Sequence, residues 1–353
     1  DILNKSIEKG KNYWVFYDGP AFANGFPGLH HMVAKNLKDI VCKYQTMKGN
    51  KVIRKIGWDT HGLPIENHVE KKLGFKAKKD IEAYGIEKFN QECRNSVREN
   101  EQAFTDLTHK MGQFIDTENP YLTYKNEYIE TEWWILKEFY KQGYFYEGTK
   151  VTPYCPRCGT GLASHEVAQG YKSVDVNTVI VPFKLKDKDE YFLVWTTTPW
   201  TLLANVALCV NPNEEYVKVS SLGHKFILAK ALKDKVVKEI EEIIETFKGK
   251  DLEYTKYEQL LPFIKVEGNS FFVTCDDYVS MEDGTGIVHM APAFGEDDSR
   301  VGKKYELAYV NPVGLDGTYK EGPWKNTLVF DADLDIIKYL KQEDKLFKKQ
   351  KIT

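Results

Sequence analysis

Two adjacent histidines, His30 and His31, stand where a glycine-containing loop meets the start of a helical pattern. The amino terminus of a helix presents unpaired backbone N–H groups and the positive end of the helix dipole, which makes it a favourable seat for phosphate. Imidazoles at that position can donate hydrogen bonds to phosphate oxygens. The glycines at 19, 25 and 28 would let a nucleotide approach the backbone closely. The alternative is that the histidines only cap or pack the first helical turn.

A single carboxylate follows the next strand pattern along the chain. Asp59 belongs to the segment GWDTHGLPIE at 57–66. A carboxylate at the carboxyl end of a strand could hold an α-ammonium group through charge-assisted hydrogen bonds. An aspartate that caps a turn or a helix is the competing interpretation, and the spacing alone supports it equally.

Hydroxyl groups, an imidazole and carboxylates gather in two later segments. The first, TTTPWTL at 196–202, follows a strand pattern, and the second, GTGIVHMAP at 284–292, leads into GEDD at 295–298. Together these groups could hold a small amine-bearing ester with a water molecule beside it. They are not arranged as a Ser-His-Asp triad. A threonine-rich turn with a capping aspartate is the alternative.

Cys155 and Cys158 form a CxxC knuckle whose two thiolates can share one zinc ion. A structural zinc site usually has four ligands, so only half of such a site is visible. A redox dithiol is the competing interpretation, but that motif usually precedes a helix in a thioredoxin-like βαβ unit, and this context is lacking. The other four cysteines are isolated inside strand or helix patterns and are expected in the core.

The elements that carry the first two segments alternate between strand and helix. Strand patterns over 13–17 and 52–56 precede helix patterns over 28–47 and 65–73. This rhythm is typical of a parallel sheet, whose ligands bind at the carboxyl ends of the strands. Apolar residues recur every three or four positions along the first helix, which predicts one core-facing apolar side.

Residues 80–143 are predicted to be helical throughout, and beyond them the pattern changes to short strands, with one further helix over 230–247. The expected strands cover 178–185, 191–195, 205–210, 216–219, 225–228, 271–274 and 286–290. We therefore predict an α/β domain at 1–160 with a Rossmann-type parallel sheet and a helical insert. A β-barrel-rich domain at 161–353 follows it.

Composition limits the classes of protein that fit. The 353 residues are enough for two cores, and a formal net charge of -3 neither indicates nor excludes a nucleic-acid partner. No run approaches the roughly 20 apolar residues that a membrane span needs. Six cysteines are too few for a disulfide framework in a chain of this length. These features predict a cytoplasmic protein without a membrane partner, and both ends look cut from a longer chain.

The runs GPAFANG at 19–25, GLHH at 28–31 and KDI at 38–40 resemble the ATP-binding signature of the class I aminoacyl-tRNA synthetases. The resemblance implies that His31 contacts the phosphates of ATP. Gly28 and His30 stand where that family has His and Gly, so a side chain at position 30 should reshape the adenine contact. We also hypothesise that this exchange is an adaptation against inhibitors that mimic isoleucyl-adenylate, such as mupirocin.

The segment that contains Asp59 is similar, almost letter for letter, to the corresponding motif of isoleucyl members of this family. Leucyl members typically carry Phe where this chain has His61, and valyl members have a different Asp-His-Ala-Gly pattern. The resemblance implies that Asp59 binds the amino group of isoleucine and that Gly19 and Pro20 line the pocket for its side chain.

The two hydroxyl- and carboxylate-bearing segments resemble the editing domain inserted into isoleucyl, valyl and leucyl synthetases, which hydrolyses mischarged aminoacyl-tRNA. The resemblance implies that His289 lines the editing pocket and that Asp298 holds the α-ammonium of the misattached amino acid. It assigns pocket shape and water placement to Thr196, Thr197, Thr198 and Asn205. One methylene in a pocket is worth only about 1–3 kcal/mol, and discrimination of isoleucine from valine by this very family is the standing example of that limit.

The resemblance as a whole implies that 1–160 is the first half of the Rossmann-type domain and that the editing domain follows it. It also implies activation of isoleucine with ATP and Mg²⁺, transfer to tRNA(Ile), and editing of Val-tRNA(Ile), all by a monomer. The catalytic groups that it implies are His30, His31, Thr198, His289 and Asp298. In isoleucyl enzymes the partner CxxC lies just beyond the β-rich insertion, so we expect the zinc bound by Cys155 and Cys158 to have further ligands outside this chain.

The family's second ATP motif, Lys-Met-Ser-Lys-Ser, does not occur in the 353 residues. We therefore expect that this stretch alone does not charge tRNA, while weak ester hydrolysis is compatible with it. Two alternatives stay open. One is a non-catalytic module that binds tRNA or nucleotide through a degenerate ATP site, and the other is a fragment of a valyl or leucyl synthetase.

Overall fold

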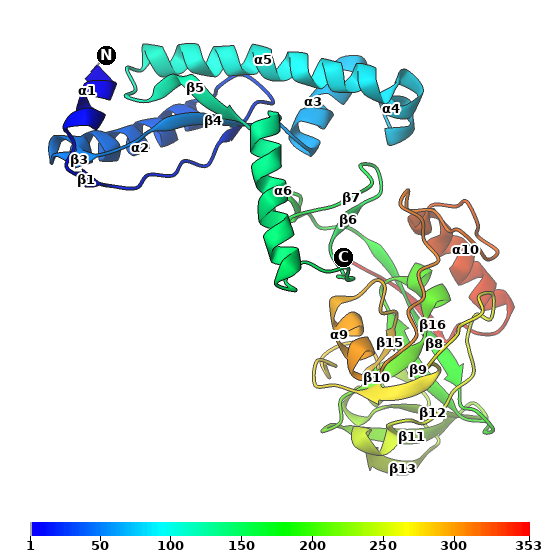
Figure 1. The fold of residues 1–353 in the computed structure, drawn as a ribbon. Coiled ribbons are helices and arrows are strands. Elements are labelled where there is room, and N and C mark those ends of the chain that lie inside the picture. The colour runs from blue at the N-terminus through cyan, green and yellow to red at the C-terminus, as the bar shows by residue number, and fades with distance from the viewer. Residues whose placement is uncertain (1) are drawn as a thin grey trace. The chain divides into compact units, whose positions relative to one another are not determined.

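The computed structural model describes residues 2–353, and the chain divides into two compact units after Gly148 (Figure 1). Cys155 and Cys158 therefore belong to the second unit, although our sequence-based boundary at 160 grouped them with the first. Among the described residues, no helix has the length and apolar character that crossing a membrane requires.

Three parallel strands form the main sheet of the first unit, in the order β2 (Ala21–Phe22), β4 (Lys55–Asp59) and β5 (Asp116–Leu122). A loop and α2 (Leu29–Met47) follow β2, and α3 (Leu63–Leu73) follows β4 (Figure 1). The carboxyl ends of parallel strands meet at one edge, so both loops with candidate site residues leave from that edge. The predicted parallel α/β arrangement is confirmed.

Two of the secondary-structure predictions for this unit are wrong. In the run 13–17 only the start is a strand, since β1 (Asn12–Tyr13) pairs with β3 (Asn50–Lys51) and Tyr17 is 92% exposed. The strand β5 lies inside the region expected to be wholly helical. Its sequence DTENPYL contains Asp, Asn and Pro, which are depleted in strands, so pairing with β4 rather than local propensity defines it.

The core of the first unit lies between the sheet and α5 (Ile86–Lys110). Trp58 of β4 meets Phe104 of this helix edge-on, with ring centroids 5.2 Å apart, and Ile56 and Leu122 complete the cluster. The remaining helices of the unit are α1 (Ile2–Lys9), α4 (Lys78–Tyr84) and α6 (Asn126–Lys141).

The apolar side of α2 is exposed, contrary to our expectation that it faces a core. Leu29, Leu37 and Ile40 are 74, 62 and 62% exposed, and Cys42 is the buried residue of this helix. The periodicity predicted the helix correctly because it is a local property. Whether another surface covers the apolar side is not encoded in that periodicity.

One large sheet organises the second unit, in the order β13-β11-β12-β9-β15-β10-β14, with β8 paired to β9 and β16 paired to β8 (Figure 1). The strands are β8 (Val176–Lys184), β9 (Tyr191–Thr196), β10 (Ala207–Val210), β11 (Glu215–Ser221), β12 (His224–Ala229), β13 (Glu242–Lys248), β14 (Phe272–Cys275), β15 (Ile287–Met290) and β16 (Lys348–Ile352). Its apolar side chains form the largest core of the molecule. The expected β-rich architecture is confirmed.

The helix expected over 230–247 is wrong. This stretch begins with η2 (Lys230–Leu232) and α8 (Lys233–Val236) and ends as β13, an antiparallel edge strand beside β11. The sequence EIIETFK fits a helix as well as a strand, and its residues are mostly exposed. Hydrogen bonding to the edge of β11 selects the strand over the helix.

Short elements connect and cover this sheet. They are β6 (Tyr154–Cys155), β7 (Thr160–Gly161), α7 (Ser164–Ala168), η1 (Pro199–Ala204), η3 (Gly249–Leu252), α9 (Glu296–Lys304) and α10 (Val329–Gln342). Of these, η1 follows β9 and the threonines at 196–198, and α9 follows β15 and carries Asp298.

Candidate functional site

His31 closes the amino terminus of α2. Its Nδ1 accepts a hydrogen bond from the backbone N–H of Gly28 at 3.0 Å, and its ring lies edge-on to Phe104. Burial and the nearby charges of His30 and Lys35 lower the pKa of His31. Because Nδ1 of this neutral imidazole is the acceptor, the proton is on Nε2, which can donate a hydrogen bond. His31 therefore caps the helix and retains one donor for an anion.

His30 folds back toward Gly28. A Cβ atom on Gly28 would stand 3.0 Å from Cε1 and from Nδ1 of the His30 ring. The rings of His30 and His31 have their centroids 3.8 Å apart. The imidazole of residue 30 thus occupies space that a side chain at position 28 would need, and both imidazoles stand together at the start of α2.

Lys35 is a cation at this helix start that sequence reasoning did not single out. Its ammonium lies 5.7 Å from the centroid of the Trp58 ring. Burial lowers the pKa of Lys35, against the opposing influence of Asp18, which itself pairs with Lys38. Lys35 follows His31 by four positions, and this spacing, which places two residues on one helix face, is the signal that could have identified it.

Asp59 stands at the carboxyl end of β4, as expected. It is paired with Phe22 of β2, and its carbonyl oxygen accepts the N–H of Ala23 at 3.1 Å. Within residues 2–353 its carboxylate accepts only the N–H of His61, at the long distance of 3.5 Å. A half-buried carboxylate held this weakly by its own loop is free to bind a cationic group.

Gly19 and Pro20 come directly before β2. Gly19 is exposed and Pro20 is partly buried. They precede Phe22, the partner of Asp59 in the sheet, by two or three residues, so they lead into the strand beside the candidate ammonium ligand.

A chain of hydrogen bonds in the second unit links the threonine-rich loop to His289. The Oγ1 atoms of Thr196 and Thr198 are 3.3 Å apart, and those of Thr198 and Thr201 are 3.1 Å apart. Oγ1 of Thr201 lies 2.8 Å from Nε2 of His289. Thr197 is partly buried within the same loop. The fold thus brings these predicted residues together and adds Thr201, which the sequence showed only as one letter of the motif.

His289 is neutral because burial lowers its pKa to about 4. Its Nδ1 atom is buried and has no hydrogen-bond partner within residues 2–353. A buried polar atom without a partner costs about 1–3 kcal/mol, so such an atom points to a ligand or a water molecule. The unmet hydrogen-bonding capacity of His289 therefore marks this location as a candidate binding site.

Asp298 lies near the end of the strand that carries His289. Its Oδ2 accepts the backbone N–H of Ala291 at 2.9 Å, and burial raises the pKa of Asp298. A Cβ on Gly295 would come within 2.8 Å of the Asp298 carboxyl carbon. Glycine at 295 therefore leaves room for the carboxyl group beside the end of β15.

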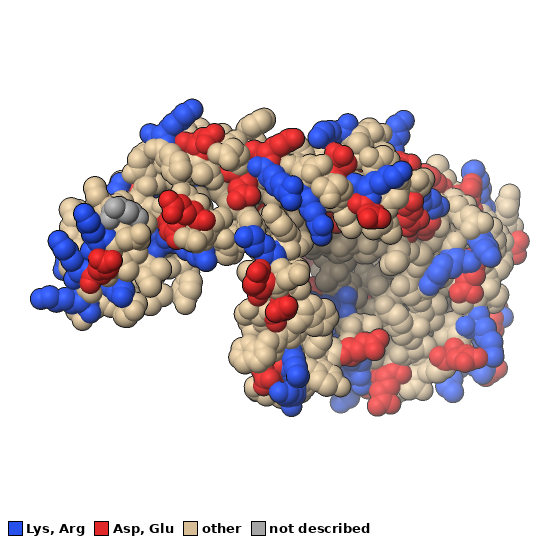
Figure 2. Space-filling model, turned by 45° about the horizontal axis from the view of Figure 1, so that its top comes forward, with Lys and Arg blue, Asp and Glu red and all other residues tan. Residues whose placement is uncertain are grey.

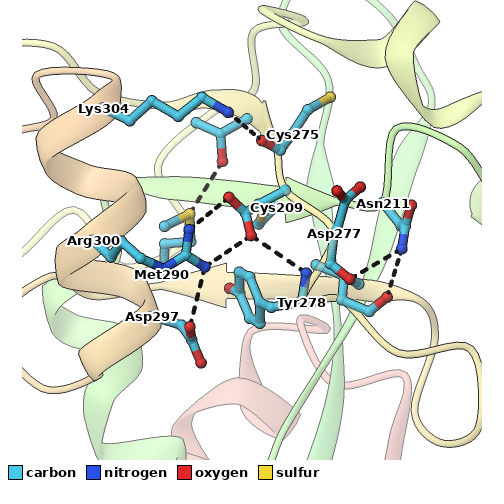
Figure 3. A network of polar contacts seen from close by, with 12 residues as sticks. Cys209, Asn211, Cys275, Asp277, Tyr278, Met290, Asp297, Arg300 and Lys304 are labelled. Atoms are coloured by element: carbon cyan, nitrogen blue, oxygen red, sulfur yellow. Dashed lines mark hydrogen bonds and ion pairs between the residues drawn. The ribbon is translucent and has the colours of Figure 1, made fainter.

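Ion pairs fix the helix that carries Asp298. Arg300 of α9 binds the two carboxylate oxygens of Asp276 at 2.9 and 2.8 Å and Asp297 at 3.1 Å (Figure 3). Arg300 lowers the pKa of Asp276, which directly follows β14. A bidentate pair of this kind is more geometrically specific than a single contact. It ties the first turns of α9, including Asp298, to the end of β14.

Asn205 directly follows η1, and its buried side-chain amide forms hydrogen bonds inside the core. Its Nδ2 donates to the carbonyl of Ala207 at 2.9 Å, and its Oδ1 accepts the hydroxyl of Tyr257 at 2.7 Å. Tyr257 is buried, and no sequence motif indicated it. These contacts suit a residue that supports the chain after η1.

Cys155 and Cys158 lie at the β6–β7 hairpin. The backbone N–H of Cys158 donates to Sγ of Cys155 at 3.4 Å, which keeps the two residues in a tight knuckle. Burial and the neighbouring Cys155 thiol raise the pKa of Cys158. In the part of the chain that the structure describes, no three His, Cys, Asp or Glu side chains form a group that could hold a metal ion.

Basic and acidic side chains are interspersed over the face shown in Figure 2. This mixture agrees with the near balance of 49 Lys and Arg against 52 Asp and Glu. Phosphate contacts on that face would come from separate cations rather than from one continuous basic stripe.

Comparison with known families identifies the class of protein. The family described as tRNA synthetases class I (I, L, M and V) matches residues 2–264, and the chain belongs to this family. The isoleucine–tRNA ligases of Clostridium novyi (strain NT) and Clostridium acetobutylicum are each 48% identical to it over 358 aligned residues. Both alignments cover 100% of this chain and 34% of the relative, so the chain spans about a third of their length.

A solved structure is also similar to part of the chain. The editing domain of the cytosolic leucyl-tRNA synthetase from P. knowlesi is 12% identical, with a TM-score of 0.41. That likeness covers 50% of this chain and 97% of the other.

Proposed function

We propose that this chain is part of an isoleucine–tRNA ligase that activates isoleucine with ATP and Mg²⁺ and transfers it to tRNA(Ile). We further propose that the second unit is an editing domain, which hydrolyses Val-tRNA(Ile). The observation that carries the editing proposal is the Thr201–His289 contact beside Ala291, whose N–H is bound by Asp298. The 48% identity to ligases of that name supports the activation proposal.

The first unit would supply the groups that hold ATP and isoleucine. The Nε2–H of His31 and the imidazole of His30 would donate to phosphate oxygens, and Gly28 would admit the nucleotide to the start of α2. Asp59 would accept the ammonium of isoleucine, with Gly19 and Pro20 beside its side chain. These residues act chiefly by electrostatic positioning of an attack on the α-phosphate.

The second unit would hydrolyse the ester of a mischarged tRNA. The oxygen of a water molecule attacks the ester carbonyl carbon, the bond to the ribose oxygen breaks, and that ribose oxygen takes up a proton. Asp298 would hold the α-ammonium of valine, while Thr198 and His289 would orient the water. Thr196, Thr197 and Asn205 would shape the pocket. A pocket too small for isoleucine supplies discrimination that a single methylene cannot give during activation.

We propose that Cys155 and Cys158 contribute two thiolates to a zinc site. The knuckle geometry fits two of the four ligands of a structural zinc ion. Because residues 2–353 contain no third ligand grouped with them, the other ligands would come from another segment. Bound zinc would fix the hairpin covalently.

All six cysteines are free thiols, which fits a reducing compartment. We propose that the protein works as a monomer in the cytoplasm.

The decisive experiment measures hydrolysis of Val-tRNA(Ile) and of Ile-tRNA(Ile) by the 353-residue chain and by its Asp298→Ala variant. We expect slow hydrolysis that prefers the valyl ester and is lost in the variant. Equal hydrolysis of both esters would contradict an editing site selective for valine. Isoleucine-dependent pyrophosphate exchange by the chain alone would contradict our view that activation needs more than these residues.

A further inference from the structure

Asp333 is a partly buried carboxylate that the proposed chemistry leaves unused. It lies on α10, and its Oδ1 accepts the backbone N–H of Trp200 at 2.8 Å. Trp200 is the second residue of η1, which begins at Pro199. N–H groups in the first turn of a helix have no partner within that helix. The carboxylate therefore binds a group that η1 cannot satisfy by itself.

Tyr319 holds the other polar backbone atom of Trp200. Its hydroxyl donates to the Trp200 carbonyl oxygen at 2.6 Å, and its side chain is 1% exposed. The indole of Trp200 also packs edge-on against Phe294, with ring centroids 5.0 Å apart, and against Phe330 at 6.2 Å. Side chains separated from Trp200 by more than 90 residues thus fix its N–H, its carbonyl and its ring.

The residue that follows Trp200 is part of the candidate site. Oγ1 of Thr201 donates to the Thr198 carbonyl at 2.8 Å and lies equally close to Nε2 of His289. The N–H of Thr201 donates to the same Thr198 carbonyl at 2.9 Å. Displacement of the Trp200 backbone would therefore displace the hydroxyl that contacts His289.

We propose that Asp333 and Tyr319 are positioning residues for the deacylation reaction. They hold Trp200 so that the Thr201 hydroxyl stays in contact with His289 and with the Thr198 hydroxyl. This inference rests on the proposed editing function, and it extends that function to two residues from outside both sequence motifs.

The environment of Asp333 supports this role. Burial raises its pKa to about 6, and the N–H of Trp200 only partly opposes that effect. Desolvation makes it costly to bury a carboxylate here, and an apolar side chain would cost less free energy at the same position. The contact to η1 provides a reason for its presence.

The test compares kcat and KM for Val-tRNA(Ile) hydrolysis by the 353-residue chain and its variants. We expect Asp333→Ala to lower kcat about tenfold to a hundredfold with KM within about twofold, because misplacement of a reacting group mainly affects the chemical step. Asp333→Asn should recover most of the rate, since its carbonyl oxygen can still accept the Trp200 N–H. Tyr319→Phe should lower kcat in the same way as Asp333→Ala.

Asp335 provides the matched control on the same helix. It is exposed and pairs with Lys338, so Asp335→Ala removes the same charge without touching η1 and should leave kcat unchanged. If the wild-type chain is active, two results would overturn this inference but not the editing function. One is an unchanged kcat in Asp333→Ala, and the other is an Asp333→Asn variant as slow as Asp333→Ala. An inactive wild-type chain would overturn the editing function and this inference with it. If Asp333→Ala fails to fold, the kcat values of Asp333→Asn and Tyr319→Phe are compared instead. A lower kcat in Tyr319→Phe supports the inference, and equal kcat values overturn it.

Discussion

Thr201 and His289 are 88 residues apart in the sequence, yet Oγ1 of one lies 2.8 Å from Nε2 of the other inside the second unit. Thr201 comes from η1 after β9, and His289 comes from β15, which pairs with β9 in parallel. The contact therefore depends on two strands that are neighbours only in the folded sheet.

Removal of the Thr201 hydroxyl should impair both stability and hydrolysis. Thr201→Val keeps the shape but leaves Nε2 of buried His289 without its partner, which we expect to cost about 1–3 kcal/mol of unfolding free energy. Thr201→Ser retains the hydroxyl and should preserve most of the deacylation rate. Urea denaturation and Val-tRNA(Ile) hydrolysis measure the two effects, and a Thr201→Val variant as active as Thr201→Ser would contradict a role for this hydroxyl.

The contribution of His289 to the stability of the second unit should decrease as pH falls from about 6.5 toward 4. The pKa of His289 is about 4 in the folded chain, below the ordinary value of 6.5, so over this range the unfolded chain binds a proton that the folded chain does not. The full effect is about 3 kcal/mol. His289→Gln should flatten this part of the pH dependence, measured by hydrogen exchange of β15 amides.

Asp333 should contribute the opposite pH dependence. Its folded pKa of about 6 lies above the ordinary value of 3.8, so acidification through this range favours the folded chain. Asp333→Asn should therefore make stability fall more steeply on acidification than in the wild type. A less steep fall, measured by hydrogen exchange of α10 amides, would show that the carboxyl group is not buried as described.

The Gly28 and His30 positions should behave as a coupled pair. Gly28→His alone brings a new side chain within about 3 Å of the exposed His30 ring, so one ring must turn away, and the first unit should lose about 0.5–1 kcal/mol of unfolding free energy. The double variant Gly28→His with His30→Gly removes that crowding and should recover most of the loss. Denaturation of the three chains measures this coupling, and additive effects would contradict it.

The same exchange can be examined in a full-length parent ligase. We expect pyrophosphate exchange both in the natural form and in the double variant, because an imidazole stands near position 28 in each. A natural form without exchange would favour a binding module with a degenerate ATP site. Equal inhibition of both forms by mupirocin would remove the basis for our hypothesis of adaptation to such inhibitors.

Gly57 should tolerate no side chain while Tyr121 stands opposite it. These residues pair between β4 and β5, and a Cβ on Gly57 would lie 2.1 Å from the Tyr121 ring. We expect Gly57→Ala to cost about 1–3 kcal/mol of unfolding free energy. In a Tyr121→Ala background the same change should cost much less, and equal costs in a double-mutant cycle would contradict the predicted contact.

The sequence by itself determined the local features of this protein. The periodicity of α2 and α3 and the alternation of the strands in the second unit depend on neighbouring residues, so these elements could be predicted from the sequence. The motifs around His31, Asp59 and Thr198 likewise indicated where chemistry should lie. The strand β5 was missed because pairing with β4, rather than its own residues, stabilises it.

Only the tertiary structure decided how distant residues meet. No pattern in the sequence links Asp333 or Tyr319 to Trp200, because these contacts join segments more than 90 residues apart. The neutral state of His289 is also a tertiary property, since burial by surrounding elements lowers its pKa. Local sequence specifies which groups are present, whereas long-range packing sets their distances and their access to water.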